Sequence, residues 1–251
     1  MENIKKPVFG IVVFPGTNCE FDCYHALQDI LGAGCKFIWH NDKSAAGIDA
    51  IVLPGGFSYG DYLRSGAVAK FSPIMEYVRK FADKGKLIIG ICNGFQILLE
   101  QGMLPGAMLR NNTLKFICKF IHTRVENSGT PFTCNLKKGQ IIKIPIRHNE
   151  GNYYINEKGL DGLEKNNQVI LRYCSKEGVV SDEHNPNGAI ESIAGICNKE
   201  MNVFGLMPHP EACCENILGS EGGIGIFSSM IKAQPESMQL FCRGDFPTET
   251  I

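Results

Sequence analysis

Two short segments of the sequence carry residue types that together could perform nucleophilic catalysis. The first, G-I-C-N-G-F-Q at residues 90–96, places Cys92 between two glycines directly after the apolar run 87–91. A buried strand, a tight turn and a helix are the setting of the nucleophile elbow G-x-S-x-G, here with cysteine in place of serine. The helix N-terminus would favour a thiolate and stabilise a nearby oxyanion. Cys92 is the candidate nucleophile, and a purely structural turn is the alternative.

The second segment, M-P-H-P-E at residues 207–211, closes a short apolar strand and supplies a candidate base. His209 would then lie at the same carboxyl edge of the sheet as Cys92. Glu211 can accept the Nδ1–H of the imidazole and leave Nε2 for the thiol. The order Cys, His, Glu differs from that of the α/β-hydrolases, which indicates another family with similar geometry. Four other histidines stand in contexts typical of structural or surface residues: His25, His40, His122 and His184.

A third segment, P-G-G-F-S-Y-G-D-Y-L-R-S-G at residues 54–66, follows the apolar run A-I-V-L. It lacks the G-K-[ST] of a phosphate-binding P-loop. Two glycines just past a strand can instead turn a backbone N–H toward the carbonyl oxygen opposite the elbow. Gly55 and Gly56 are therefore candidate oxyanion-hole residues, with an ordinary turn as the alternative.

The elements that must position these residues can be predicted from the hydrophobic pattern. Apolar runs at 8–14, 37–39, 50–53 and 87–91 alternate with helical spacing at 22–31 and 68–82. Runs without polar alternation indicate strands buried on both faces, and their alternation with helices predicts a doubly wound parallel sheet. After Gly106 the sequence becomes β-rich, which favours an antiparallel extension or a flap, before a last helix at about 224–233. We expect one α/β domain over residues 1–251.

Composition limits the classes of partner. The 251 residues are 44% hydrophobic and carry a formal net charge of -1, so nothing favours a nucleic acid or an anionic membrane as partner. No segment reaches the roughly 18 apolar residues that span a bilayer, and the first apolar run has no cleavage site after it. The eleven cysteines are odd in number and no secretion signal accompanies them, so we expect reduced thiols and a cytoplasmic location. They contain no C-x-x-C pair, so we expect no metal site.

Taken together, the three segments resemble the class I (triad) glutamine amidotransferases, and within them the glutaminase subunits of phosphoribosylformylglycinamidine synthases. The resemblance extends over about residues 8 to 211 and rests on F-P-G-T-N-C-E-F-D, L-P-G-G-F-S-Y-G-D-Y-L-R-S-G-A-V-A, L-R-N-N-T-L-K-F-I-C, H-N-E-G-N-Y-Y, N-P-N-G and I-A-G-I-C-N. It implies a three-layer αβα, flavodoxin-like fold and hydrolysis of glutamine in purine biosynthesis.

The resemblance also implies a role for each matching position. Cys92 matches the nucleophile that forms a γ-glutamyl thioester, His209 the base and Glu211 its orienter. Gln96 matches a residue that helps to hold the substrate glutamine. The backbone oxyanion donors are implied at Gly56 and Asn93, with Gly55 as the alternative to Gly56.

Partners follow from the same resemblance. Ammonia would pass to a large ATP-dependent synthetase subunit that amidates formylglycinamide ribonucleotide, and a small subunit would bridge the assembly. ATP and Mg²⁺ would be used by the synthetase, with no cofactor in this chain, which carries no ATP-binding motif of its own.

Two segments depart from the usual pattern of the family. R-H-N-E-G, residues 147–151, replaces Ala-His-Gly-Glu-Gly, and Cys213 with Cys214 follows Pro210-Glu211-Ala212. We expect neither departure to touch the triad. His148 and Glu150 are expected to face the partner or the mouth of a channel, with a solvated polar loop as the alternative.

Two other classes of function remain open at the level of sequence. One is a different triad enzyme, such as a peptidase or a γ-glutamyl hydrolase, although related peptidases tend to place histidine directly after the elbow cysteine, where this chain has Asn93. The other is a binding subunit with a vestigial elbow. Labelling of Cys92 and the products of hydrolysis would distinguish the three.

Overall fold

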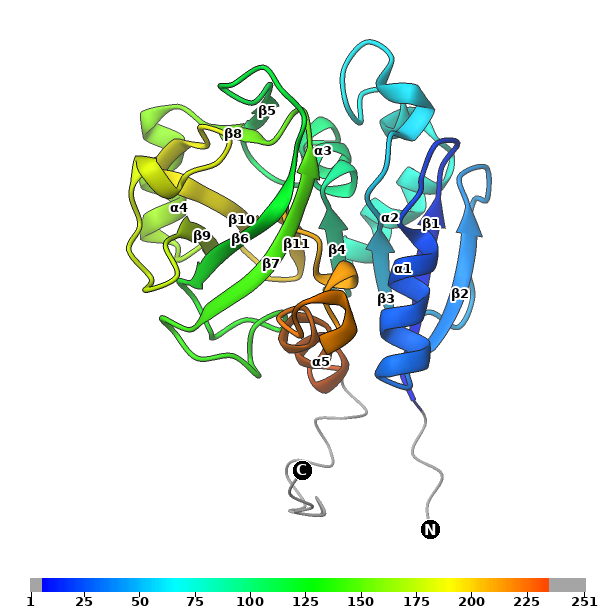
Figure 1. Ribbon diagram of the computed structural model, residues 1–251. Coiled ribbons are helices and arrows are strands. Elements are labelled where there is room, and N and C mark those ends of the chain that lie inside the picture. The colour runs from blue at the N-terminus through cyan, green and yellow to red at the C-terminus, as the bar shows by residue number, and fades with distance from the viewer. Residues whose placement is uncertain (1–5, 235–251) are drawn as a thin grey trace, which may run out of the picture.

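A computed structural model describes residues 6–234 and contains a nine-stranded mixed sheet with the order β2-β1-β3-β4-β11-β10-β9-β6-β7 (Figure 1). A two-stranded sheet, β5-β8, stands beside it. The strands are β1 (Val8–Val13), β2 (Gly34–Trp39), β3 (Ala50–Leu53), β4 (Leu87–Ile91), β5 (Ala107–Leu109), β6 (Ile117–Val125), β7 (Ile141–His148), β8 (Asn152–Tyr154), β9 (Val169–Cys174), β10 (Ile193–Cys197) and β11 (Val203–Leu206).

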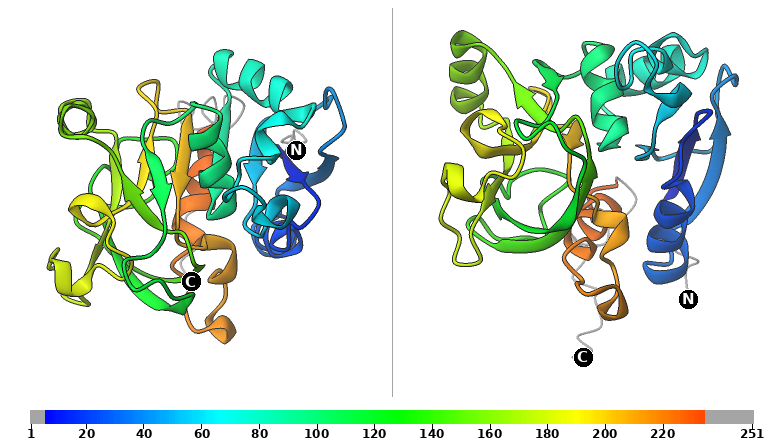
Figure 2. Two further views of the ribbon diagram at one scale, coloured as in Figure 1. Left: turned by 90° about the horizontal axis from the view of Figure 1, so that it is seen from above. Right: turned by 45° about the horizontal axis from the view of Figure 1, so that its top comes forward.

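Helices cover both faces of the parallel half of this sheet. The α-helices are α1 (Glu20–Tyr24), which continues as a π-helical turn over His25–Ile30, α2 (Ile74–Asp83), α3 (Asn93–Glu100), α4 (Glu157–Lys165) and α5 (Ile224–Lys232). Helix α1 lies on one face, and α2 and α3 lie on the other (Figure 2). None of the helices within residues 6–234 has the length and apolar character needed to cross a membrane.

The parallel half agrees closely with the prediction from apolar runs. Strands β2, β1, β3, β4 and β11 run parallel to one another, and every residue of β3 and β4 is buried. The predicted helix over 68–82 begins later, because only α2, from Ile74 onward, is α-helical. Ser72 precedes Pro73 and is extended, as residues before proline tend to be, so the helix starts after that break.

The β-rich half continues the same sheet. Strands β10, β9, β6 and β7 pair antiparallel beyond β11, which confirms an antiparallel extension rather than a separate flap.

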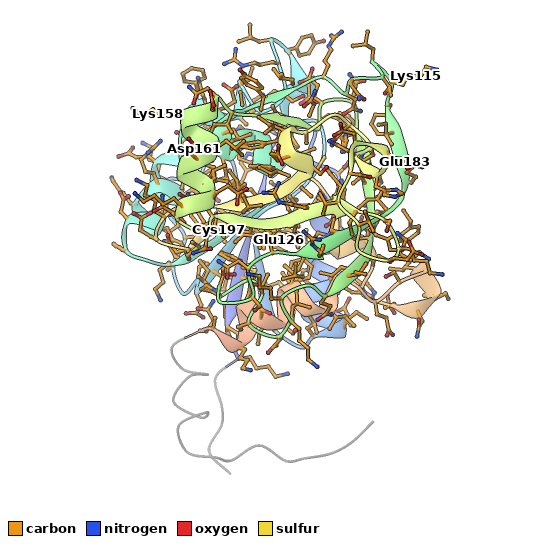
Figure 3. All side chains as sticks on the ribbon, turned by 90° about the vertical axis from the view of Figure 1, so that its left-hand side faces the viewer. Lys115, Glu126, Lys158, Asp161, Glu183 and Cys197 are labelled. Carbon is orange, nitrogen blue, oxygen red and sulfur yellow. The ribbon has the colours of Figure 1, made fainter. Side chains whose placement is uncertain are left out.

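Helix α4 was not predicted, because its nine residues E-K-G-L-D-G-L-E-K include two glycines. The Asn156 side chain caps it by accepting from the Gly159 N–H, and Leu163 is buried beneath it. Figure 3 shows this side of the molecule, with Lys158 and Asp161 of α4 exposed. A single domain over residues 1–251 stays a prediction, since residues 1–5 and 235–251 lie outside the described ones.

The turn between β4 and α3 is strained at Cys92 and is packed so closely that only glycine fits at positions 90 and 94. Cys92 adopts φ 51° and ψ -103°, a strained backbone for a residue with a side chain. A Cβ added to Gly90 would lie 2.6 Å from the Gly94 carbonyl oxygen. A Cβ on Gly94 would collide with the backbone of Leu53 at the end of β3. The two glycines therefore allow helix α3 to pack directly on the sheet below the cysteine.

This packing predicts a large loss of stability for Gly94→Ala. The new methyl group would collide with backbone that cannot move aside, so we expect more than about 4 kcal/mol of destabilisation, or no soluble protein. Gly162→Ala in α4 is the matched control, since nothing lies within 4 Å of a Cβ there, and it should stabilise the protein by about 0.5–1 kcal/mol. Urea unfolding monitored by circular dichroism measures both. Equal stability of the two variants would contradict this account of the turn.

Candidate active site

Cys92 lies at the carboxyl end of β4 and is the residue that precedes α3. Its side chain is buried, and its thiol donates to the carbonyl oxygen of Arg147 at 3.6 Å. Strand β11 runs parallel to β4 directly beside it, with Leu206 paired to Ile91. The residues that follow the two strands therefore meet at one edge of the sheet, as the sequence predicted for Cys92 and His209.

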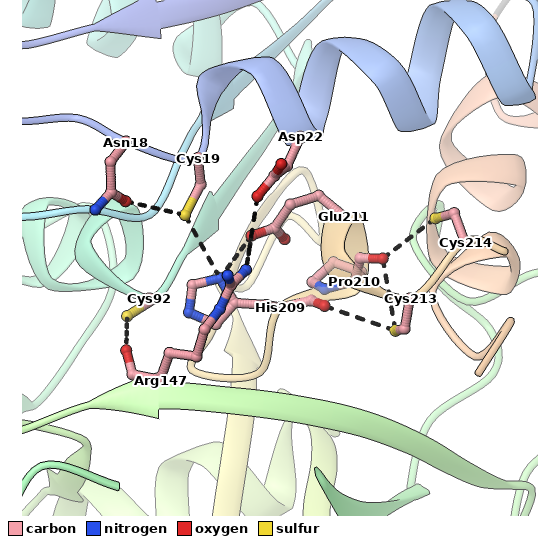
Figure 4. A network of polar contacts seen from close by, with 10 residues as sticks. All are labelled: Asn18, Cys19, Asp22, Cys92, Arg147, His209, Pro210, Glu211, Cys213 and Cys214. Carbon is pink, nitrogen blue, oxygen red and sulfur yellow. Dashed lines mark hydrogen bonds and ion pairs between the residues drawn. The ribbon is translucent and has the colours of Figure 1, made fainter. Parts of the chain in front are cut away.

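His209 and Glu211 form a buried pair next to Cys92 (Figure 4). The imidazole Nδ1–H donates to Glu211 Oε1 at 2.5 Å, and the His209 backbone N–H donates to the carbonyl oxygen of Pro145 in β7 at 2.9 Å. The buried Nε2 has no hydrogen-bond partner among the described residues, so it is available to the thiol and its substrate. Burial alone would lower the pKa of His209, but the negative charges of Glu211 and Cys92 outweigh it and raise that pKa well above its usual value. This balance of charge favours the protonated, imidazolium form of His209.

Cys19 completes the surroundings of the imidazole and was not singled out from the sequence. Its sulfur lies 3.9 Å from His209 Nδ1, and its thiol donates to Asn18 Oδ1 at 3.2 Å. Burial raises the pKa of this thiol. Cys19, His209 and Glu211 resemble a set of metal ligands, but the 2.5 Å between Nδ1 and Oε1 is shorter than the about 3.3 Å that separates two ligands on a tetrahedral zinc ion. The pair is arranged as a hydrogen bond.

The glycine turn after β3 faces the elbow. Gly56 has φ 142°. On either side of it, the Gly55 carbonyl accepts from the Asn18 N–H and the Phe57 N–H donates to the Gly16 carbonyl. The Gly56 N–H has no backbone partner among the described residues. Gly55 instead packs on the imidazole, since a Cβ there would lie 2.7 Å from His209 Cε1. This arrangement favours Gly56 over Gly55 as the oxyanion donor that the sequence left open.

Asn93 and Gln96 bind the first turn of α3 to the surrounding loops. Asn93 Oδ1 accepts from the Ser58 N–H at 3.1 Å, and its Nδ2 donates to Gln96 Oε1 at 2.9 Å. Gln96 Nε2 in turn donates to the carbonyl oxygen of Glu150 at 2.6 Å. Asn93 begins α3, so its backbone N–H is one of the unpaired groups of the helix N-terminus and an available oxyanion donor.

A cavity of about 330 Å³ opens above Cys92, and its walls include Gly56, Asp61, Gln96, Arg110, His148 and Glu150. That volume corresponds to about ten water molecules, which suits a small polar molecule. His25, His40, His122 and His184 do not line it. His25 contacts Asp29 and Glu215, and His40 contacts the Tyr59 hydroxyl, in agreement with their predicted structural or surface roles.

The solvated loop considered for His148 is wrong, because this side chain is 3% exposed at the end of β7. Its Nδ1–H donates to Asn111 Oδ1 at 3.0 Å, and its buried Nε2 has no partner among the described residues. Both His148 and Glu150 line the cavity, so they belong to the site itself. The sequence carried one signal for this, the H-N-E-G motif, but the sheet order that brings β7 to the elbow is not visible in it.

The buried His148 predicts a fold that loses stability in acid. Burial, and then the positive charge of His209, lower the pKa of His148 to about 3. Unfolding restores a pKa near 6.5, so between about pH 6.5 and pH 3 the unfolded chain binds an additional proton and stability falls as the pH falls. We expect His148→Gln to lose less stability than the wild type between about pH 7 and pH 5, measured by urea unfolding. His184→Gln, in the half-exposed turn at Asp182–His184, is the control. Parallel pH curves for wild type and His148→Gln would contradict the prediction.

The expectation that neither departure from the family pattern touches the triad is wrong. The Arg147 carbonyl accepts from Cys92, and the Arg147 guanidinium lies 3.8 Å from Glu211 Oε1 and 3.7 Å from Asp22 Oδ2. The Cys213 thiol donates to the His209 carbonyl at 3.6 Å, and the Cys214 thiol donates to the Pro210 carbonyl at 3.2 Å. Both departures therefore act on the backbone or the charge of the His209–Glu211 turn (Figure 4).

Comparison with known proteins agrees with this site. The model of the CobB/CobQ-like glutamine amidotransferase domain matches residues 6–241, so the chain belongs to this family of glutamine amidotransferases. Phosphoribosylformylglycinamidine synthase subunit PurQ of Salinibacter ruber is 55% identical over 223 residues, which are 89% of this chain and 95% of that protein.

Solved structures are similar as well. A chain in the structure of PurLQS from Thermotoga maritima has 46% identity and a TM-score of 0.80, over 90% of this chain and 98% of that one. A glutamine amidotransferase from Thermotoga maritima has 12% identity and a TM-score of 0.53, over 96% of this chain and 86% of that one, and shows the fold alone. The fold, a mixed sheet with helices on both faces, is thus that of the class I glutamine amidotransferases.

Proposed function

We propose that this chain is the ammonia-generating glutaminase subunit of a phosphoribosylformylglycinamidine synthase in purine biosynthesis. The observation that carries the proposal is the burial of a thiol, an imidazole and a carboxylate at one edge of the sheet, with Nδ1 of His209 held by Glu211 at 2.5 Å. Relatives 49–55% identical, named as this subunit, support the same function.

In the first half of the reaction, the Cys92 thiolate attacks the side-chain carboxamide carbon of glutamine. The negative charge that develops on the carbonyl oxygen is stabilised by the backbone N–H groups of Gly56 and Asn93. Nε2–H of His209 then protonates the departing nitrogen as the C–N bond breaks, so ammonia and a γ-glutamyl thioester form. Gln96 helps to hold glutamine in the cavity. The raised pKa of His209 supports its role as the acid in this step.

In the second half, His209 acts as a base. Its neutral Nε2 accepts a proton from water, the resulting hydroxide equivalent attacks the thioester carbon, and the C–S bond breaks to release glutamate and the Cys92 thiolate. Glu211 keeps Nδ1 protonated throughout, so Nε2 is always the nitrogen that exchanges the proton.

The ammonia passes to a large synthetase subunit, which converts formylglycinamide ribonucleotide to formylglycinamidine ribonucleotide, and a small subunit bridges the complex. ATP and Mg²⁺ serve that synthetase, and this chain works without a cofactor or a metal of its own. Neither a nucleic acid nor a membrane takes part, and the complex works in the cytoplasm.

A glutamine-mimicking diazoketone tests the proposal. We expect it to alkylate Cys92 in the presence of the synthetase and bridging subunits, and peptide mass spectrometry locates the adduct. Glutamine hydrolysis should be slow for the isolated chain and faster in the complex. An adduct elsewhere, or hydrolysis of peptides with no glutaminase activity in the complex, would favour another triad enzyme instead. An unreactive Cys92 would favour the vestigial subunit.

A further inference from the structure

The cavity above Cys92 contains two carboxylates that the proposed chemistry does not use. Asp61 lies in the turn Ser58–Asp61 after β3, and Glu150 follows β7, so the two reach the same cavity from opposite halves of the sheet. Both groups are shielded from water in part. Neither carboxylate is needed to attack, protonate or stabilise the reacting carboxamide.

The turn that carries Asp61 is held in a strained conformation. Tyr59, Asp61 and Leu63 have φ of 54°, 53° and 73°, which are left-handed values that residues with side chains rarely adopt. Strain of this kind persists where the surrounding structure requires it, and it is frequent in ligand-binding turns. Here Ser58 is fixed by Asn93 at 3.1 Å, and Asn93 Nδ2 donates to Asp61 Oδ1 at 3.2 Å. The turn thus presents Asp61 at a defined distance from the start of α3.

Of the two carboxylates, Asp61 is the one whose negative charge has no cationic side chain of the described residues beside it. Glu150 Oε1 lies 3.8 Å from Arg110 Nε, whereas no cationic side chain of the described residues lies within ion-pair distance of Asp61. Burial, and further the negative charge of Glu150, raise the pKa of Asp61 to about 6, although hydrogen bonds from Ser65 and Asn93 act in the other direction. A site with this balance of charge favours the binding of a small cation.

We propose that Asp61 binds the α-ammonium group of the substrate and thereby makes the site selective for a free α-amino acid. The inference rests on the proposed glutaminase function, since Cys92 must act on the other end of the same molecule. Asn93 Nδ2 donates both to Asp61 Oδ1 at 3.2 Å and to Gln96 Oε1 at 2.9 Å, so a single side chain separates this carboxylate from the residue expected to hold glutamine. Asp61 is a specificity residue and takes no part in proton transfer.

A pair of substrates tests this role directly. Glutaramate has the carboxamide and the α-carboxylate of glutamine but lacks the α-amino group. In the complete complex, Asp61→Asn should lower kcat/KM for glutamine by about 10- to 100-fold, because a charge-assisted hydrogen bond is lost. The same variant should change kcat/KM for glutaramate by less than about threefold, since that substrate never made the contact.

Binding without turnover provides a second measurement. Protection of Cys92 from alkylation by iodoacetamide gives dissociation constants for both compounds even where glutaramate is hydrolysed too slowly to follow. The amide introduced by Asp61→Asn would keep an oxygen for the Asn93 side chain, so the fold of the turn is preserved. Asp161→Asn on the exposed face of α4 is the matched control and should leave both substrates unaffected.

The possible failures can be told apart. An equal loss for glutamine and glutaramate in Asp61→Asn would assign Asp61 a structural role only, and no loss for either would exclude it from the site. Both results overturn the inference while wild-type glutaminase activity stands. A wild-type complex that does not hydrolyse glutamine would instead refute the proposed function.

Discussion

Cys92→Ala will abolish glutamine-dependent synthesis by the complex and leave ammonia-dependent synthesis intact. The thioester cannot form without the thiol, so glutamate release should fall by at least about 10⁴-fold. Ammonia supplied as a salt bypasses this chain and reaches the synthetase directly. The measurement is product formation with glutamine and with ammonium chloride, on the same preparation of the complex.

Two further variants make the result for Cys92 specific. Cys92→Ser should also be inactive, because a hydroxyl is a far weaker nucleophile than a thiolate next to an imidazolium. Cys118→Ser, at an exposed cysteine of β6, is the control and should retain full activity. Glutamine-dependent synthesis by Cys92→Ala at more than a trace would rule out the thioester mechanism.

Glu211→Gln should lower kcat for glutamine hydrolysis by about 10²- to 10⁴-fold. The glutamine amide can donate to Nδ1, which would place the proton on Nε2 and leave the imidazole in the tautomer that cannot accept from the thiol. Loss of the carboxylate also removes the charge that raises the pKa of His209 against the effect of burial. The pH dependence of kcat should therefore shift toward lower pH on its acidic side.

The control for Glu211 is Glu215→Gln. Glu215 Oε2 contacts His25 Nε2 at 2.8 Å near the surface, so the same chemical change is made at a histidine that does not line the cavity above Cys92. Steady-state kinetics should be unchanged there. A Glu211→Gln variant with the wild-type pH profile would mean that Glu211 does not orient the base.

The local part of the site was predictable from the sequence because it depends on neighbouring residues. A strand, a turn with glycines at both sides of Cys92 and a helix are encoded in a few adjacent positions, and so is the turn that joins His209 to Glu211. Parallel strands then bring the two turns to one edge of the sheet. This much follows from hydrophobic pattern and turn chemistry alone.

The remaining part was not predictable, because it depends on pairing between distant strands. Arg147 and His148 reach the elbow only because β7 ends there, and its place in the sheet follows from β6 and β9 rather than from its own sequence. The position of Asp61 could not be predicted for another reason, since it depends on a strained turn, and such a turn has no hydrophobic pattern that marks it in the sequence. Helix α4 was missed because packing of Leu163, and not intrinsic propensity, stabilises it.

The end of β7 has a mechanical consequence. Backbone carbonyls of Pro145, Arg147 and Glu150 accept hydrogen bonds from His209, Cys92 and Gln96 respectively. The proposed base, the proposed nucleophile and the residue proposed to hold the substrate therefore all attach to one short stretch of main chain. A displacement of this stretch by a docked subunit would move all three contacts at once. Because the accepting groups are backbone carbonyls, these contacts depend on the position of the main chain and not on its side chains. Glutaminase activity could then be switched by assembly alone, with no change in the catalytic groups themselves.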